Sequence, residues 1–267
     1  RNLTFDYINS FDREKDELAE KLSKGNITAI GITTTLYTSS YPILEIVSFI
    51  KRYNKSAKII VGGPFIASSV HTMDEPALQE LMKSIGADFY INSAQGEAAL
   101  VNVLSALKDN SLYENIENIY FLKDGKYVST QTSMENNLLE DNLIDWNLYG
   151  EKVGEYAAVR TATSCPFSCA FCAFPTHAGQ YQTVSVEGIE KELNQLESIG
   201  TVKCISFVDD TFNVPLDRFK DILKMMIKNK YSFKWNSYFR CQFADEETVE
   251  LMKQSGCDGV FLGIESG

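Results

Sequence analysis

Short β-branched runs alternate with helix-periodic segments in the N-terminal part of the chain. Residues 27–32 and 58–61 are β-branched runs that end at turn residues, which is typical of buried strands. Residues 42–53 carry apolar side chains at helical spacing, with a proline near the start, where its missing N–H costs nothing. A helix, a strand and a helix follow at 78–85, 88–91 and 97–107. This alternation predicts a doubly wound parallel sheet.

A second alternation of strands and helices occupies the C-terminal half. Strands are expected at 157–161, 202–208, 233–239 and 259–264, and helices at 186–198, 216–228 and 246–255. Each of the first three strands is followed by a helix, which is the repeat of an α/β barrel. The expected fold class is therefore α/β, with a doubly wound sheet followed by part of a barrel.

Two features lie between these halves. Residues 119–128 are typical of a β-hairpin with an Asp-Gly turn. Residues 131–152 are rich in Asn and Asp, with scattered apolar residues, and are expected to form a linker on the protein surface. We therefore expect a first domain at 1–130 and a second at 153–267. Because the chain starts at Arg1 and stops at Gly267 within a strand-and-loop element, we expect both domains to be incomplete.

Composition narrows the classes of partner. The 267 residues include 25 Lys and Arg against 36 Asp and Glu, a net charge of −11. A broad nucleic-acid surface needs clustered positive charge, so no nucleic-acid partner is expected. No run approaches the roughly 18 apolar residues of a membrane span, and no targeting segment is visible. The expectation is a cytoplasmic protein without a membrane partner.

A compact group of cysteines provides the strongest chemical signal. Cys165, Cys169 and Cys172 have the spacing C-x3-C-x2-C. Cysteine thiolates are the usual ligands of iron–sulfur clusters, and three of them leave one iron of a 4Fe-4S cluster open to a small molecule. Phe171 stands directly before the third cysteine, where its ring can cover the cluster. The alternative is a zinc site with His177 as the fourth ligand.

Charged residues follow the expected barrel strands. Asp209 and Asp210 follow the second strand, Arg240 the third and Glu265 the fourth. Reactive groups collect at the C-terminal ends of the strands in α/β barrels. A carboxylate accepts hydrogen bonds from an ammonium group, and a guanidinium holds a carboxylate. This set therefore suits a zwitterionic ligand.

The cysteine spacing, with an aromatic residue before the last cysteine, resembles the radical S-adenosylmethionine (SAM) superfamily. The resemblance implies a (β/α)6 barrel, of which the chain contains a part. It implies that SAM chelates the open iron of a 4Fe-4S cluster and is cleaved to a 5′-deoxyadenosyl radical. It also implies an electron donor such as flavodoxin or ferredoxin, and SAM contacts from the strand-end residues Asp209, Asp210, Arg240 and Glu265.

The N-terminal half resembles the cobalamin-binding domain. Thr34 and Leu36 match its Ser/Thr-x-Leu segment, and Gly62 and Gly63 match its glycine pair. The resemblance implies that the nucleotide tail of cobalamin lies against the bare backbone of that pair. The family's D-x-H-x-x-G loop is absent, so no His from this chain is expected to ligate cobalt, and His71 is expected to be a surface residue.

Together these resemblances imply a cobalamin-dependent radical SAM methyltransferase that acts on a small-molecule or peptide natural product. Cys-Ala-Phe-Pro-Thr-His-Ala-Gly and Val-Asp-Asp-Thr-Phe-Asn-Val-Pro are most similar to the subgroup named for phosphinate P-methylation. Two alternatives stay open. One is a cobalamin-binding radical SAM enzyme with a reaction other than methylation, and the other is a non-enzymatic metal-binding or cobalamin-binding protein.

Overall fold

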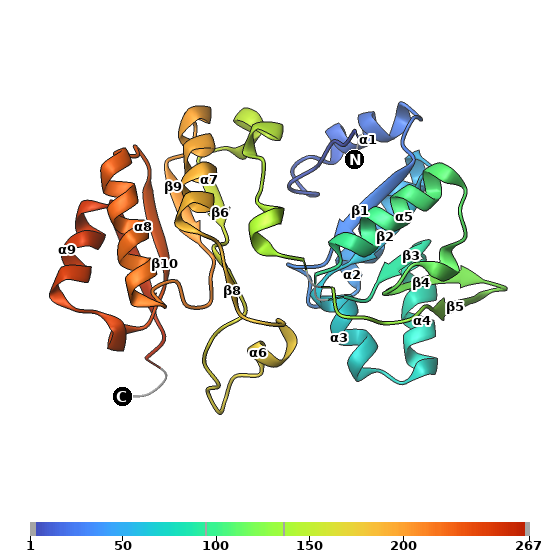
Figure 1. Cartoon of the computed structure of the whole chain (residues 1–267). Helices are drawn as coiled ribbons and strands as arrows, with labels where there is room; N and C mark the ends of the chain where they lie inside the picture. Colours follow the sequence, from blue (N-terminus) through green and yellow to red (C-terminus); the bar gives the residue numbers. More distant parts are fainter. Residues whose placement is uncertain (1–3, 94, 136, 265–267) are drawn as a thin grey trace. The chain divides into compact units, whose positions relative to one another are not determined.

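The computed structural model describes residues 4–93, 95–135 and 137–264, without the side chains of Thr176 and His177. The chain forms two compact units, Arg1–Asn136 and Asn137–Gly267 (Figure 1). Among the helices of the described residues, none is long and apolar enough to cross a membrane.

The first unit contains a five-stranded sheet in the order β1-β2-β3-β4-β5. Its strands are β1 (Ala29–Thr33), β2 (Lys58–Gly62), β3 (Phe89–Ile91), β4 (Ile119–Lys123) and β5 (Lys126–Ser129). The pairs β1–β2 and β2–β3 are parallel, as predicted, but β4 and β5 pair antiparallel. The predicted parallel strands are therefore confirmed, and the predicted hairpin adds two antiparallel strands to their sheet. The predicted hairpin joins the same sheet beside β3, and its apolar residues Ile119 and Phe121 pack in one core with Phe89 and Ile91 of that strand.

Helices cover both faces of this sheet, as the doubly wound pattern predicts. The helices are α1 (Lys15–Ser23), α2 (Tyr41–Tyr53), α3 (Pro64–Thr72), α4 (Glu75–Ile85) and α5 (Glu97–Asp109). Ile59 and Val61 of the interior strand β2 pack in one apolar core with α2 and α4. Ile60 between them faces the opposite core, against α5. Successive residues of a strand point to opposite faces, so β2 is buried on both sides.

Local signals set the bounds of α4. The Asp74 side chain accepts a hydrogen bond from the Ala77 N–H at 2.9 Å, which satisfies one of the free donors of the first turn. Gly86 ends the helix in the left-handed conformation, with φ 70°. Asp74 and Gly86 therefore lie on either side of the helix that periodicity predicted at 78–85.

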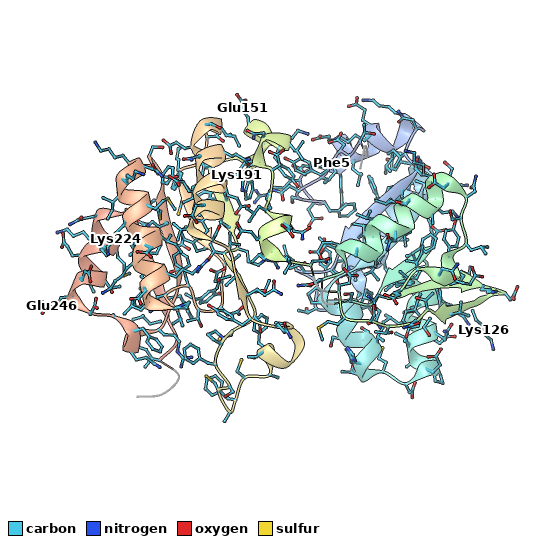
Figure 2. All side chains as sticks on the ribbon, viewed as in Figure 1. Phe5, Lys126, Glu151, Lys191, Lys224 and Glu246 are labelled. Atoms are coloured by element: carbon cyan, nitrogen blue, oxygen red, sulfur yellow. The ribbon has the colours of Figure 1, made fainter. Side chains whose placement is uncertain are left out.

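The second unit contains a four-stranded parallel sheet in the order β11-β10-β9-β6. Its strands are β6 (Tyr156–Val159), β9 (Cys204–Phe207), β10 (Lys234–Phe239) and β11 (Cys257–Leu262), and its long helices are α7 (Val186–Ile199), α8 (Leu216–Asn229) and α9 (Glu246–Gln254). The predicted strand–helix repeat is confirmed. Exposed charged side chains lie on these helices, for example Lys191, Lys224 and Glu246 (Figure 2).

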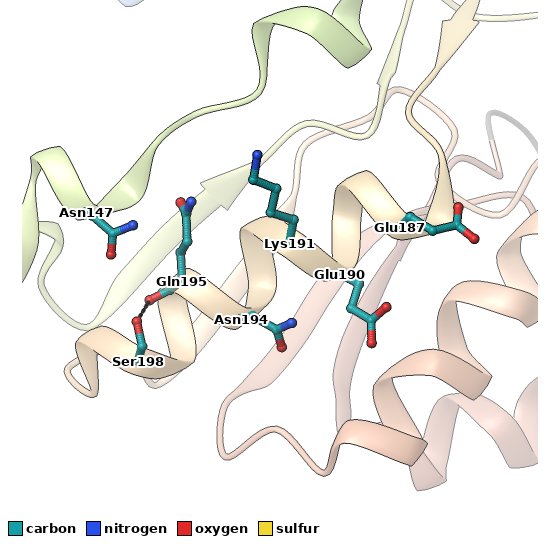
Figure 3. A pocket seen from close by; sticks show the side chains of 7 residues that line it. All are labelled: Asn147, Glu187, Glu190, Lys191, Asn194, Gln195 and Ser198. Atoms are coloured by element: carbon teal, nitrogen blue, oxygen red, sulfur yellow. Dashed lines mark hydrogen bonds between the residues drawn. The ribbon is translucent and has the colours of Figure 1, made fainter.

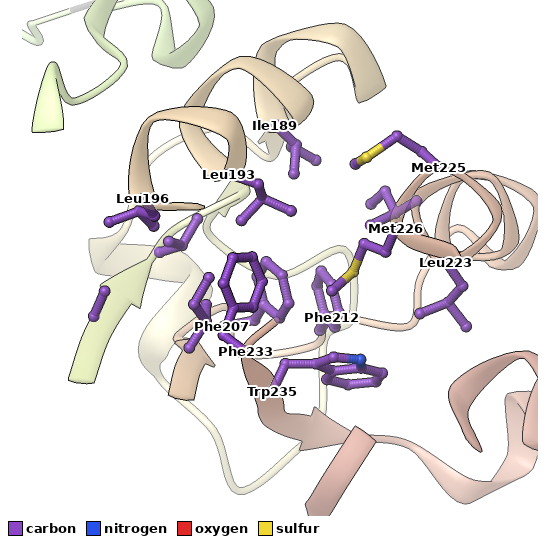
Figure 4. Packing of buried hydrophobic residues seen from close by; sticks show 14 of the residues in the cluster. Ile189, Leu193, Leu196, Phe207, Phe212, Leu223, Met225, Met226, Phe233 and Trp235 are labelled. Atoms are coloured by element: carbon purple, nitrogen blue, oxygen red, sulfur yellow. The ribbon is translucent and has the colours of Figure 1, made fainter. Parts of the chain in front are cut away.

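An aromatic core fills the space between this sheet and its helices (Figure 4). Phe207 and Phe212 stack with their ring centroids 4.2 Å apart, and the Trp235 ring meets both edge-on. Phe207 is the last residue of β9, and Phe212 lies after Asp209 and Asp210. The stacked rings therefore anchor both ends of the acidic loop in the core.

The other face of this sheet is accessible. Ser206 donates a hydrogen bond to Asn236 at 2.8 Å, and Asn236 donates to the Cys204 sulfur at 3.4 Å. Tyr238 and Phe261 are exposed and meet edge-on at 5.3 Å between centroids. One buried face and one accessible polar and aromatic face are what a segment of barrel wall would have.

Two segments take more structure than the sequence predicted. The cysteine loop stands on a two-stranded stem, β7 (Ala162–Thr163) and β8 (Gln182–Thr183), and contains the short helix α6 (Phe174–His177). Part of the predicted linker forms three 3-10 turns, Leu139–Asn142, Trp146–Leu148 and Gly150–Val153. Its backbone binds helix α7 of the second unit, because the Ile144 N–H donates to Glu192 at 2.7 Å and the Trp146 N–H to Gln195 at 2.8 Å.

Candidate active site

Most of the predicted reactive groups lie at the carboxyl-terminal edge of the second sheet. The strands are parallel, so the segments after β6, β9 and β10 reach the same edge. The cysteine loop follows β6, the pair Asp209 and Asp210 follows β9, and Arg240 follows β10. Glu265 lies outside the described residues.

Asp209 is buried at the root of the cysteine loop. The residue is 2% exposed, and its carboxylate accepts hydrogen bonds from the Thr161 N–H at 2.6 Å and the Ala162 N–H at 2.9 Å. The Thr161 hydroxyl donates to its other oxygen. Burial raises the pKa of Asp209, while these hydrogen bonds lower it. The carboxylate therefore holds the backbone that leads into the loop.

Arg218 of helix α8 also binds the backbone at the stem of the loop. Its guanidinium donates to the Thr161 carbonyl at 2.9 Å and to the Val184 carbonyl at 2.9 Å. These residues precede and follow the stem, and the Val184 N–H also donates to Thr161 at 2.9 Å. Burial lowers the pKa of Arg218, whereas the charge of Asp209 raises it. Asp209 and Arg218 thus bind opposite ends of one residue, Thr161.

Sequence reasoning missed Arg218, although one signal was present. The residue lies in the first turn of α8, where the helix dipole disfavours a positive charge. A cation at that position indicates a compensating partner, here two carbonyl groups and the nearby carboxylate of Asp209.

The three cysteines lie on one loop beside the strand ends. The Cys165 sulfur is 3.5 Å from the Thr211 hydroxyl, and the Cys169 sulfur accepts a hydrogen bond from Arg240 at 3.8 Å. Cys172 is exposed, and its N–H closes a turn to the Cys169 carbonyl at 3.0 Å. Across the described residues, no three His, Cys, Asp or Glu side chains come together closely enough to hold a metal. Three thiols on one exposed loop still match the donor chemistry of an iron–sulfur site.

The other predicted residues of this edge are accessible. Phe171 is 71% exposed, next to the third cysteine. Asp210 is exposed, in contrast to Asp209. Partial desolvation of its carboxyl group raises the pKa of Asp210, and the charge of Asp209 raises it further. The two carboxylates thus differ: that of Asp209 is hydrogen-bonded to the stem of the loop, and that of Asp210 is accessible to a ligand.

Arg240 is fixed through its backbone. Asn213 is fully buried, accepts a hydrogen bond from the Arg240 N–H at 3.0 Å and donates one to the Arg240 carbonyl at 2.9 Å. This pair of bonds ties the end of β10 to the segment that follows the acidic loop. The direction in which Arg240 leaves the strand is therefore set by tertiary contacts.

The residues predicted to bind cobalamin lie at the carboxyl-terminal edge of the first sheet. Thr34 is buried, its hydroxyl accepts a hydrogen bond from the Phe65 N–H at 3.2 Å, and its N–H donates to the Gly62 carbonyl at 2.8 Å. Leu36, two residues further on, is 89% exposed. His71 is exposed on α3, as expected for a surface residue.

The glycine pair has a structural reason of its own. Gly63 has φ 111°, and a Cβ there would lie 2.8 Å from the Thr34 hydroxyl and 2.9 Å from the Thr34 nitrogen. A Cβ on Gly62 would lie 3.2 Å from the Cβ of Ile91. Groups of the protein itself therefore come close to both glycines. A side chain at either glycine would disturb this packing, so such variants are unsuitable as tests of cobalamin binding.

A shallow polar depression lies elsewhere in the second unit, along the outer side of α7 (Figure 3). It is lined by Asn147, Glu187, Glu190, Lys191, Asn194, Gln195 and Ser198. None of the predicted site residues is among them. The depression is therefore separate from the strand-end site.

Comparison with known proteins supports the chemistry of this edge. Residues 159–267, which include the cysteine loop and every strand-end charge, match the model of the radical SAM superfamily. An uncharacterized methyltransferase of Pyrococcus horikoshii is 25% identical over 259 residues, which are 94% of this chain and 54% of that protein. The chain thus spans about half the length of this relative.

Two solved structures have the same fold across both units. The radical SAM methyltransferase TsrM from Kitasatospora setae, with cobalamin and a 4Fe-4S cluster bound, aligns with a TM-score of 0.70 at 18% identity, covering 95% of this chain and 53% of TsrM. The cobalamin-dependent SAM radical enzyme OxsB aligns with a TM-score of 0.72 at 18% identity, covering 97% of this chain and 38% of OxsB. This chain therefore shares the fold of these two radical SAM enzymes, both of which are described with cobalamin bound.

Replacing Asp209 by Asn should destabilise the second unit. The amide oxygen would still accept from the N–H groups of Thr161 and Ala162, but the NH2 group would face the Thr161 hydroxyl, and the negative charge near Arg218 would be lost. We expect a loss of about 1–3 kcal/mol in unfolding free energy. The same change at exposed Asp210 should stay within about 0.5 kcal/mol. Both tryptophans, Trp146 and Trp235, belong to this unit, so urea unfolding followed by tryptophan fluorescence reports on it alone. Equal stability of the two variants would contradict the assignment.

Proposed function

We propose that this chain, whose residues 159–267 form a radical SAM domain, is the cofactor-binding part of a cobalamin-dependent methyltransferase. The observation that carries the proposal is the position of the cysteine loop. Its thiols Cys165 and Cys169 lie within reach of side chains from two neighbouring strand ends, Thr211 and Arg240. A cluster held by the three cysteines would therefore be bound where polar groups can take up a second ligand.

The cluster and SAM together supply the radical chemistry of this superfamily. The three cysteines hold the cluster through their thiolates. Asp210 and Arg240 are the residues we assign to SAM, the exposed carboxylate to the ammonium group and the guanidinium to the carboxylate. The hydrogen bonds of Asp209 are directed to Thr161 and Ala162, so we assign it to the stem of the loop instead. Phe171 is available to pack on the ligand beside the third cysteine.

We assign cobalamin to the carboxyl-terminal edge of the first sheet. Ligands of open α/β sheets bind at this edge, and both TsrM and OxsB are described with cobalamin. Thr34 fixes the loop after β1 to the start of α3 through the Phe65 N–H. That contact leaves Leu36 as an exposed apolar side chain on a defined loop. The proposed cobalamin site therefore consists of this loop and the backbone of Gly62 and Gly63.

The proposed reaction transfers a methyl group to a small-molecule or peptide substrate, with an electron donor such as flavodoxin or ferredoxin. The short sequence resemblances to the subgroup named for phosphinate P-methylation favour a phosphinate as the substrate. Mass spectrometry of the product tests the reaction type, because methylation adds one methylene unit per turnover. A radical product without that gain would instead favour another radical SAM reaction.

The first prediction from this proposal concerns the cluster. Replacing Cys165, Cys169 or Cys172 by Ala should abolish both iron–sulfur assembly and SAM cleavage, because each removes one of three thiolate ligands. Iron and sulfide analysis after anaerobic reconstitution measures the first, and formation of 5′-deoxyadenosine the second. Cys257→Ala, at the start of β11, is the control and should keep both. Wild-type protein that takes up stoichiometric zinc and no iron would refute the proposal.

The second prediction concerns SAM. Asp210→Ala or Arg240→Ala should weaken SAM binding by about 2 kcal/mol, roughly thirtyfold in Kd, because each removes one charge-assisted contact. The iron content of the reconstituted protein should not change. Asp221→Ala, at an exposed position of α8, should bind SAM like the wild type. Equilibrium binding to the reconstituted protein is the measurement, and unchanged affinity in both variants would count against these roles.

The third prediction concerns cobalamin. The wild-type chain should bind hydroxocobalamin, and Leu36→Asp should weaken binding by about 2 kcal/mol, because it replaces an apolar contact with a charge. Folding should be unaffected, since Leu36 is 89% exposed. Leu112→Asp is the matched control, a leucine of the same unit that is 71% exposed. Absorbance titration measures binding, and a wild-type chain that takes up no cobalamin would exclude this part of the proposal.

A further inference from the structure

A cation–aromatic stack joins the cysteine loop to the end of β10. The guanidinium carbon of Arg240 lies 3.9 Å from the ring centroid of Phe167. Phe167 in turn stacks on Phe243, with 5.7 Å between centroids and 29° between planes. Phe167 belongs to the loop, between Cys165 and Cys169, whereas Phe243 ends the 3-10 turn that follows β10.

This stack determines what Arg240 can reach. Asn213 fixes the backbone of Arg240, and the Phe167 ring fixes the plane of its guanidinium. In that position one guanidinium nitrogen donates to the Cys169 sulfur at 3.8 Å. Within the described part of the chain, the side chain has no other hydrogen-bond partner or ion pair. The loop thus supplies both the ring that orients the arginine and the thiol that the arginine contacts.

We propose that Phe167 is a positioning residue that holds Arg240 against Cys169, so that the guanidinium sets the reduction potential of the cluster. The inference rests on the proposed function, because it takes Cys169 as a cluster ligand. It adds a role for a residue that the cysteine spacing does not single out, and a second role for Arg240 beside the contact with SAM.

The physical basis is electrostatic. Reduction adds one negative charge to the cluster, and a cation or N–H donor beside a ligand sulfur stabilises the reduced form. The attraction weakens as the separation between cation and sulfur grows, so the orientation of the guanidinium matters. An aromatic ring under a guanidinium supplies attraction that an aliphatic side chain cannot. Without the ring, Arg240 is free to leave Cys169 for solvent.

The experiment compares reconstituted holoprotein variants in redox titrations followed by electron paramagnetic resonance, without SAM. Phe167→Leu should shift the cluster potential to more negative values at unchanged iron and sulfide content. Phe167→Tyr keeps the aromatic face and should have the wild-type cluster potential. Phe174→Leu removes a partly exposed ring from the same loop and should leave the potential unchanged.

A double-mutant cycle tests whether Phe167 acts through Arg240. Arg240→Gln should produce the same negative shift, and adding Phe167→Leu to it should shift the potential no further. A purely structural role for Phe167 would instead lower the iron content and leave the potential of the remaining clusters unchanged.

The outcomes separate this inference from the proposed function. Wild-type protein without a 4Fe-4S cluster would overturn both. A normal cluster in the wild type, with Phe167→Leu and Arg240→Gln both at the wild-type potential, would overturn the inference alone. If Phe167→Leu fails to load iron, the Arg240→Gln variant still tests the inference. A cluster potential equal to that of the wild type in this variant would overturn the role assigned to Arg240.

Discussion

The buried carboxylate of Asp209 is the interaction on which the site of the second unit depends. It ties the end of β9 to the backbone after β6, and Arg218 binds the carbonyl of the same residue, Thr161. Burying these charged groups is costly unless their hydrogen bonds are satisfied, and here both have partners of suitable geometry. Because the bonds go to backbone groups on both sides of the loop stem, they fix where the cysteine loop leaves the sheet.

The adjacent acidic residues Asp209 and Asp210 lie in different environments. Asp209 is buried, whereas Asp210 is exposed in the turn that begins there. The Phe207–Phe212 stack holds both ends of this segment in the core. A rigid aromatic core therefore supports an edge at which one carboxylate is structural and the other is accessible.

The first unit follows the same principle with smaller side chains. At its carboxyl-terminal edge, Gly63 lets the backbone come within van der Waals distance of Thr34, and Thr34 links the loop after β1 to the first turn of α3. The glycine conformation and the threonine hydrogen bond depend on one another. They leave a defined loop with Leu36 exposed.

Sequence by itself determined the features that depend on neighbours along the chain. Apolar periodicity located the main helices and parallel strands, and the cysteine spacing located the loop that residues 159–267 share with the radical SAM superfamily. Only the tertiary structure decided that β4 and β5 join the first sheet, that Asp209 is buried, and that Phe167 contacts Arg240. The physical reason is the separation of the partners. Thr161 and Arg218 are 57 residues apart, and Cys169 and Arg240 are 71 apart, so the packing of whole strands and helices selects them and no local pattern records them.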